Sequence, residues 1–282
     1  MLLHLITVAT HSERYLPVLE KQAETNGVKL VKLGMGKKYS GHYMKDLETI
    51  DYLKTVNRED IVAFVDGFDS LMLANKDEVL GKFKETGAEL LLSVENIGVL
   101  SFIHATVFER VKGKYINTGL YMGKAGFLLD FLEEMYKTDY NKQSNQKTWC
   151  SHLFKLDREG KFDGIKLDNH SKVFLNHSFT TSNNPIIKKN RIVIDNGEKP
   201  CFIQGNGCED MTHIIKATGN SKDNIHKSEF MKKKLQYNVK SIFKVYTPIL
   251  TFYVYLIVLF VVTFGYLGYN IYKNKNHEYF YI

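Results

Sequence analysis

Short β-type and α-type segments alternate through most of this chain, and this alternation restricts the folds that it can adopt. Apolar, β-rich stretches are followed by stretches whose apolar residues recur at helical spacing. The expected strands are 4–9, 28–33, 60–65 and 89–94, and the expected helices are 13–26, 45–56, 75–87 and 126–137. Elements of these lengths in alternation predict an α/β domain with a Rossmann-type, mainly parallel sheet and flanking helices. The second half is more irregular, with short strands expected near 173, 192–194 and 201–204.

The positive charge of the chain is concentrated in one segment. The formal net charge is +7 at pH 7. Residues 216–244 hold eight lysines against Asp223 and Glu229, whereas residues 1–215 have no basic excess. A folded body without a basic face lacks the electrostatic footprint of a nucleic-acid-binding protein, so we expect no nucleic-acid partner.

An apolar run follows the basic segment. Residues 245–272 contain no charged side chain, and only the short polar tail 273–282 comes after them. About 20 apolar residues span a bilayer core, so the run predicts one C-terminal transmembrane helix rather than a buried core helix. Lysines before the run outnumber those after it, and the positive-inside rule then places the body on the cytosolic side. The sequence therefore predicts a membrane protein with a single-pass C-terminal anchor and a cytosolic body.

Two carboxylates follow the most apolar strand. Asp66 and Asp69 come directly after residues 60–65 (DIVAFV), at the carboxyl end of an expected strand. Ligands bind at that edge of an open α/β sheet. Two hard oxygen ligands on a short loop suit Mn²⁺ or Mg²⁺, and such an ion can neutralise a nucleotide diphosphate as leaving group. The alternative is structural, with Asp66 ending the strand and Asp69 capping a turn.

Three further features add to this edge. Asn117 and Thr118 lie in a segment of small residues that lets backbone approach a ligand. Residues 204–207 (QGNG) follow an expected strand and can wrap around phosphate. Lys45 opens a helix after a glycine-rich loop and can reach phosphate, although a solvated helix lysine is the more common structure.

Together these segments resemble a known family. The chain is similar to the GT-A-type glycosyltransferase domain of the multifunctional procollagen lysyl hydroxylases (PLOD-like) over most of residues 3–215. The resemblance is carried by residues 7–10 (TVAT), 64–69 (FVDGFD), 92–95 (LSVE), 115–119 (YINTG), 167–174 (LDNHSKVF) and 204–207 (QGNG). It implies transfer of a sugar from a UDP-sugar donor, UDP-glucose or UDP-galactose, to a glycan or protein acceptor, with collagen-like proteins among the candidates.

The resemblance also implies roles for individual residues. The matched metal ligands for Mn²⁺ (or Mg²⁺) are Asp66, Asp69 and Gln204. The matched donor-binding positions are Val8, Thr10, Phe68, Glu95, Gly205, Asn206 and Gly207. Asn117, Asn145 and Gln146 match positions at the reacting sugar. Asp168 matches a family position for which we expect a structural role.

Several of these positions depart from the family pattern. Gln204 stands where the family has a histidine ligand, and residues 208–210 (CED) lack the lysine that meets phosphate. Val99 stands in place of a tryptophan. Residues 144–149 (SNQKTW) replace an acidic run, and amides cannot act as a general base or a nucleophilic carboxylate. Three functions remain open: a membrane-anchored glycosyltransferase, a noncatalytic nucleotide- or glycan-binding relative tethered to a membrane, and a different metal-dependent transferase or nucleotide hydrolase.

Overall fold

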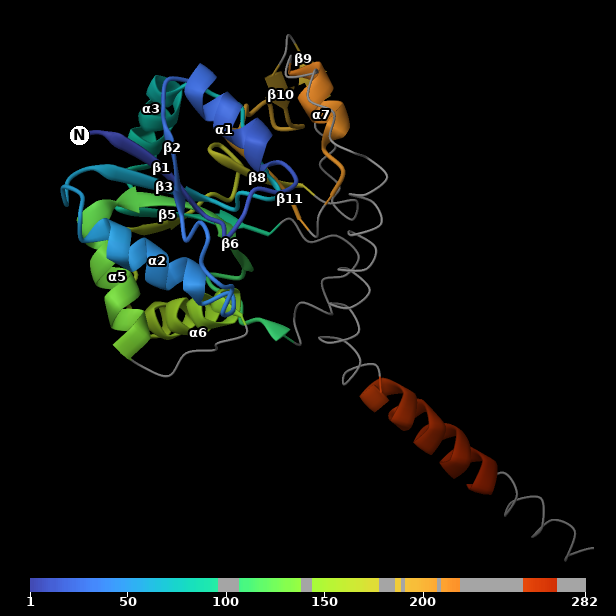
Figure 1. Ribbon diagram of the computed structural model, residues 1–282. Helices are drawn as coiled ribbons and strands as arrows, with labels where there is room; N and C mark the ends of the chain where they lie inside the picture. Colours follow the sequence, from blue (N-terminus) through green and yellow to red (C-terminus); the bar gives the residue numbers. More distant parts are fainter. Residues whose placement is uncertain are drawn as a thin grey trace, which may run out of the picture. The chain divides into compact units, whose positions relative to one another are not determined.

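The computed structural model describes residues 1–95, 107–137, 144–177, 186–188, 191–206, 209–218 and 251–267. The chain divides into two compact units, Met1–Ile225 and His226–Ile282. The first unit contains every described strand and the helices that surround them (Figure 1).

A six-stranded sheet forms the centre of the first unit. Its order is β2-β1-β3-β6-β5-β7, and the strands are β1 (Leu3–Val8), β2 (Leu30–Leu33), β3 (Ile61–Val65), β5 (Leu90–Val94), β6 (Ile116–Lys124) and β7 (Ile165–Leu167). β1 pairs in parallel with β2 and β3, and β5 pairs in parallel with β7. β6 is antiparallel to both of its neighbours, β3 and β5. The α/β prediction is confirmed, and the sheet is mixed because β6 runs opposite to the other strands. The segment of small residues around Asn117 and Thr118 is part of this strand.

Helices cover both faces of this sheet (Figure 1). One face carries α1 (Leu16–Thr25) and α3 (Lys76–Thr86), and the other carries α2 (Met44–Leu53), α5 (Ala125–Lys137) and α6 (Asn145–Arg158). β3 shows why its sequence is continuously apolar. Ile61, Ala63 and Val65 belong to the core under α1 and α3, whereas Val62 and Phe64 belong to the core under α2, α5 and α6.

Local capping fixes the ends of two helices. The Asn75 side chain accepts a hydrogen bond from the Glu78 amide at 2.9 Å at the start of α3, and Gly87 ends that helix with φ of 60°. Ser144 caps α6 by accepting from the Lys147 amide at 3.2 Å. The sequence pattern does not predict α6, because its buried face is narrow and its other positions are polar.

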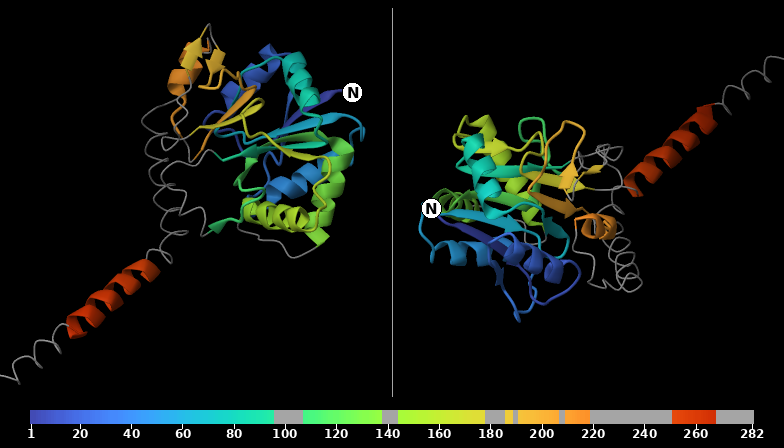
Figure 2. Two further views of the ribbon diagram at one scale, coloured as in Figure 1. Left: turned by 180° about the vertical axis from the view of Figure 1, so that it is seen from behind. Right: turned by 90° about the horizontal axis from the view of Figure 1, so that it is seen from above.

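A second, smaller sheet lies beside the first. Its order is β4-β11-β8, from β4 (Ser70–Met72), β11 (Phe202–Gly205) and β8 (Phe174–His177). β11 is antiparallel to β4 and parallel to β8. β9 (Ile186–Lys188) and β10 (Arg191–Val193) pair with each other, and α7 (Thr212–Ala217) follows. Figure 2 shows the orange β9, β10 and α7 on the side of the unit opposite the green helices α5 and α6.

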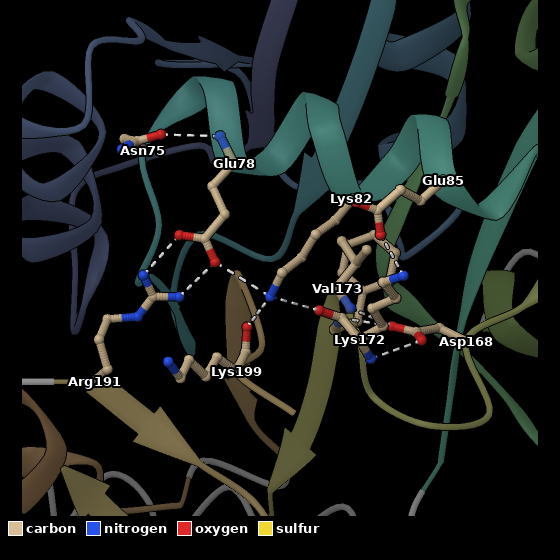
Figure 3. A network of polar contacts seen from close by, with 10 residues as sticks. Asn75, Glu78, Lys82, Glu85, Asp168, Lys172, Val173, Arg191 and Lys199 are labelled. Carbon is tan, nitrogen blue, oxygen red and sulfur yellow. Dashed lines mark hydrogen bonds and ion pairs between the residues drawn. The ribbon is translucent and has the colours of Figure 1, made fainter. Parts of the chain in front are cut away.

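A polar network joins α3 to the region around the second sheet (Figure 3). Both terminal nitrogens of Arg191 donate to the Glu78 carboxylate at 2.8 Å, and this pair lowers the pKa of Glu78 to about 2. Lys82 contacts Glu78 at 3.2 Å and donates to the backbone carbonyls of Lys172 and Lys199. The network therefore holds α3 against the segments that flank β8 and β11.

Asp168 orders the turn that leads into β8 (Figure 3). Its carboxylate accepts from the amides of Lys172, Val173 and Phe174 at 2.8, 2.8 and 2.7 Å. The side chain is buried, and burial raises its pKa despite these donors. Asp168 is thus structural, as the sequence predicts.

Residues 251–267 of the second unit are helical. Among the described residues, no helix has the length and apolar character needed to cross a membrane. The ends of the predicted transmembrane segment, 245–250 and 268–272, lie outside the described residues, as does the basic segment from residue 219 onward.

Candidate functional site

The acid pair lies where strands of both sheets meet. Asp66 follows β3, and its amide donates to the Gly119 carbonyl of β6 at 2.8 Å. Asp69 precedes β4, and its carbonyl accepts from the Gly205 amide of β11 at 2.7 Å. The short loop between the two carboxylates is therefore fixed at both ends by backbone hydrogen bonds from strands far away in the sequence.

Gln204 completes a three-residue group with these carboxylates. Its Nε2 atom donates to Asp66 Oδ2 and to Asp69 Oδ1, at 3.2 Å in each case. Its Oε1 atom is buried and has no hydrogen-bond partner among the described residues. The structure thus brings together the three side chains that the sequence assigns to a metal.

These side chains fit a hard divalent cation. Rotating the Gln204 amide by half a turn exchanges Nε2 and Oε1, an assignment that hydrogen-bond networks decide. The unpartnered oxygen would then point where the two carboxylates converge, giving the oxygen ligands that Mn²⁺ or Mg²⁺ prefers. In the part of the chain that the structure describes, no three His, Cys, Asp or Glu side chains form a metal-type group. An amide third ligand is consistent with that finding.

Gly119 makes room for Gln204. A Cβ atom at Gly119 would lie 2.3 Å from both Nε2 and Oε1 of Gln204. No side chain other than hydrogen fits at this position of β6 while Gln204 keeps its place. The glycine expected to let backbone approach a ligand instead lets a side chain of β11 approach β6.

Lys45 supplies a cation to the acid pair. Its Nζ atom lies 2.5 Å from Asp66 Oδ1, and the two side chains are 20% and 19% exposed. Burial alone would lower the pKa of Lys45, but the contact with Asp66 and the charge of Asp69 raise it overall. Burial and the neighbouring Asp66 charge raise the pKa of Asp69. The site therefore concentrates negative charge that the Lys45 ammonium group balances in part.

A second polar cluster surrounds Glu95, just beyond the end of β5. Asn117 Nδ2 donates to Glu95 Oε1 at 2.9 Å and to Asn206 Oδ1 at 3.2 Å. Asn206 also donates to the Glu95 carboxylate, and Gln146 Nε2 reaches Glu95 Oε1 at 3.4 Å. Burial raises the pKa of Glu95 to about 7, although the three amides oppose the shift. One carboxylate ringed by amides is suited to binding neutral hydroxyl groups.

A β-bulge and Asn176 place Glu95. The pairing of β5 with β6 shifts between Leu92 and Ser93, and such a bulge redirects the residues that follow it. Asn176 Nδ2 donates to Ser93 Oγ at 2.6 Å and to the Val94 carbonyl at 2.7 Å. The second sheet thereby holds the end of β5 in the bulged conformation.

Asn145 lies apart from the Glu95 cluster. Its Nδ2 atom is 3.5 Å from Oδ1 of the buried Asp46, and Trp149 Nε1 donates to the same oxygen at 3.2 Å. Trp149 is fully buried against Tyr121 and Phe131, so it is a core residue. Of the two amides predicted beside the reacting sugar, the structure brings only Gln146 to Glu95.

Further residues matched to donor binding lie near the same edge. Val8 ends β1, which is parallel to β3, so Val8 and Asp66 lie at the same end of neighbouring strands. The Phe68 ring lies 5.2 Å from the His11 ring, and Thr10 Oγ1 contacts His11 Nδ1 at 3.0 Å. Gly205 lies at the end of β11, and Gly207 lies outside the described residues.

The contact of Lys45 with the acid pair is the feature of the site that the sequence pattern did not favour. The pattern favours a solvated helix lysine, and the structure places its ammonium on Asp66 instead. The available signal is the glycine-rich loop 34–41 before α2, because such a loop can present a helix N-terminus to an anion. The sequence carries no comparable signal for the buried Asp46.

The fold is an α/β domain, and comparison with known families identifies it as a domain of the glycosyltransferase type. The family described as "PLOD GT domain" matches residues 1–229, and the chain belongs to this family.

Two curated relatives share this region. The procollagen-lysine,2-oxoglutarate 5-dioxygenase of Drosophila melanogaster is 25% identical over 224 residues, covering 71% of this chain and 30% of the relative. The multifunctional procollagen lysine hydroxylase and glycosyltransferase LH3 of Homo sapiens is 27% identical over 220 residues, covering 72% and 29%. The chain thus spans less than a third of the length of these relatives.

Solved structures of the galactosyltransferase LgtC are also similar. A complex with donor and acceptor sugar analogs is 15% identical, with a TM-score of 0.37, and covers 61% of this chain and 75% of that chain. An active-site mutant is 13% identical, with a TM-score of 0.44, and covers 80% and 99%. At these TM-scores the likeness adds nothing to the family assignment.

Proposed function

We propose that this protein is a metal-dependent glycosyltransferase that uses a UDP-sugar donor. One observation carries the proposal: β6 and β11 each have residues at both the Asp66–Asp69–Gln204 group and the Glu95 cluster. Gln204 lies on β11 and Asn206 directly follows this strand. Asn117 lies on β6, two residues before Gly119, which makes room for Gln204. A ligand with a diphosphate next to a sugar matches two such neighbouring groups.

In this proposal each group has a distinct task. Mn²⁺ or Mg²⁺, held by Asp66, Asp69 and Gln204, would neutralise the negative charge of the departing UDP. Lys45 places an ammonium group beside Asp66, where it can contact a phosphate oxygen. Phe68 offers an aromatic surface for the uracil ring.

Glu95 and its amides form the sugar half of the proposed site. A neutral hexose presents hydroxyl groups that both donate and accept, so it can satisfy Glu95, Asn117 and Asn206 together. UDP-glucose and UDP-galactose are the proposed donors. The proposed acceptor is a glycan or a protein, with collagen-like proteins included because of the family.

A second function is a noncatalytic module that binds a nucleotide or glycan. The observation that favours it is the first turn of α6, where the reacting sugar is expected. That turn offers the amides of Asn145 and Gln146, which transfer no proton, and the first of these faces Asp46.

UDP release by the full-length chain separates the two functions. The assay supplies Mn²⁺ and a panel of UDP-sugars, with the Asp66→Ala/Asp69→Ala double variant and a matched double variant, Asp130→Ala/Glu133→Ala, at exposed carboxylates of α5. Metal-dependent release that only the first pair abolishes supports the transferase. Binding of UDP and Mn²⁺ without release from any donor refutes it in favour of the binding module.

We also propose, from the sequence alone, that residues 245–272 attach the protein to a membrane with the body on the cytosolic side. The uncharged apolar run and the lysines before it are the support. Deleting residues 245–282 should move the protein from the membrane fraction to the supernatant of lysed cells. Unchanged sedimentation of the truncated chain would refute the proposal.

A further inference from the structure

Two consecutive residues of α2 serve different parts of the unit. Lys45 extends to Asp66 in the metal half of the proposed site, which consists of Asp66, Asp69 and Gln204. Asp46 is fully buried where α2 meets α5 and α6. Its carboxylate accepts from Tyr136 Oη of α5 at 2.6 Å and from Trp149 Nε1 of α6 at 3.2 Å, and it lies 3.5 Å from Asn145 Nδ2.

Among the described residues Asp46 has no direct ionic partner, which is unusual for a buried carboxylate. Burial raises its pKa to about 6, while hydrogen bonds from Tyr136, Trp149 and Asn145 and the charge of Lys45 oppose the shift. A buried carboxylate is costly unless its donors stay in place. Asp46 therefore stabilises whichever arrangement keeps these three donors around it.

Two of those donors belong to the first turns of α6. Asn145 is the first residue of that helix, and its neighbour Gln146 donates to Glu95 at 3.4 Å. Consecutive helical residues point about 100° apart, so Asn145 can face Asp46 while Gln146 faces Glu95. Fixing Asn145 and Trp149 on Asp46 thus fixes the direction in which Gln146 leaves the helix.

We propose that Asp46 is a positioning residue, which holds the start of α6 so that Gln146 reaches Glu95 in the sugar half of the site. This inference rests on the proposed function for its effect on turnover, but the tether between Asp46 and α6 is independent of it. Within one helical turn of α2, Lys45 contacts Asp66 in the metal half, and Asp46 holds the start of α6 beside the sugar half.

The test compares Asp46→Asn with Asp168→Asn in the full-length chain. Both substitutions replace a buried carboxylate that accepts three hydrogen bonds. Asp168→Asn is the matched control, because Asp168 holds the turn before β8 and not α6. Hydrogen exchange of residues 145–150 is the readout that needs no activity. We expect faster exchange there, by about tenfold or more, in Asp46→Asn only. Unchanged exchange overturns the tether.

Turnover then tests the link to the reaction. Asp46→Asn should lower kcat for UDP release by about 10- to 100-fold, since small misplacements of a site residue have effects of that size. The Kd of UDP with Mn²⁺ should stay within about twofold. Adding Asp46→Asn to Gln146→Ala should lower kcat no further, because Asp46 acts through Gln146. An unchanged kcat in Asp46→Asn, or losses that multiply, overturns the link.

A wild-type protein that releases no UDP would refute the proposed function rather than the tether. In that case the hydrogen-exchange data still test whether Asp46 holds the start of α6. Faster exchange confined to Asp46→Asn supports the positioning of α6, and equal exchange in the two variants overturns it. Tyr136→Phe, which removes one donor and keeps the ring, provides a second variant if Asp46→Asn does not fold.

Discussion

Gly119→Ala tests whether the close approach of β11 to β6 builds the metal half of the site. The added Cβ would lie 2.3 Å from the Gln204 amide, and real Cβ atoms essentially never lie closer than 3.0 Å to a heavy atom beyond their own residue and its chain neighbours. Gln204 must therefore leave its position between Asp66 and Asp69. It would lose both 3.2 Å hydrogen bonds to the carboxylates and, in the proposed complex, its place as the third ligand.

The expected effect has two parts. Because the Cβ meets the end of a flexible side chain, most of the cost comes from the two lost hydrogen bonds, and the free energy of unfolding should fall by about 1–3 kcal/mol. Weakening one of three protein ligands should raise the Kd of Mn²⁺ with UDP by about 10- to 100-fold, which corresponds to about 1.4–2.8 kcal/mol. Chemical denaturation measures the first quantity, and calorimetric titration of UDP in the presence of Mn²⁺ measures the second.

Gly123→Ala is the matched control on the same strand. Its Cβ would lie 2.8 Å from the Glu89 carbonyl oxygen, so it should destabilise the fold by about 1–3 kcal/mol without reaching Gln204. Nucleotide affinity should fall in Gly119→Ala alone. Equal affinities for the two variants would show that Gln204 does not hold the metal, and the reasoning from this contact would be wrong.

Three other substitutions have defined outcomes. Asp69→Asn should raise the unfolding free energy of the metal-free protein by about 1–3 kcal/mol at pH 8, because the raised pKa of Asp69 makes its ionised form costly in the folded state. This gain in stability should shrink toward pH 4. Thermal melting with EDTA and with Mn²⁺ should also show that Mn²⁺ no longer stabilises the variant. Glu95→Gln should lower turnover by about 100-fold while the Kd of UDP with Mn²⁺ stays within about twofold, which steady-state kinetics and titration check together. Glu78→Gln should lower the free energy of unfolding by about 1–2 kcal/mol at pH 7 and leave it unchanged near pH 2. Arg191 depresses the pKa of Glu78, so the stability that the ion pair contributes is lost as the pH falls from the unfolded pKa toward about 2. Urea denaturation at several pH values would refute this if the loss of stability in the variant were independent of pH.

The pattern of the sequence was sufficient for the elements with strong local signals. β3 is recognisable because it is buried on both faces, and α3 because Asn75 and Gly87 mark its ends. β6 was not predicted as a strand, because its small and polar residues lack the apolar pattern of the other strands, although it lies between two of them. Its antiparallel direction also had no local signature, since direction follows from the path of the chain and not from composition.

For the site, the sequence by itself determined the kinds of chemical group. Asp66 and Asp69 at a strand end pointed to a metal, and Asn117, Asn206 and Glu95 followed from the resemblance. Each of these predictions depends on residues that are close in sequence or on a motif that repeats within a family.

Only the tertiary structure decided which groups meet. Gln204 reaches the acid pair across 135 or more residues because β11 lies beside β4 and Gly119 leaves space for it. Lys45 became a partner of Asp66, and Asn145 turned to Asp46 instead of the sugar half. The physical reason is that burial, packing and long-range strand pairing select side-chain partners, and none of these is encoded in the local pattern of the chain.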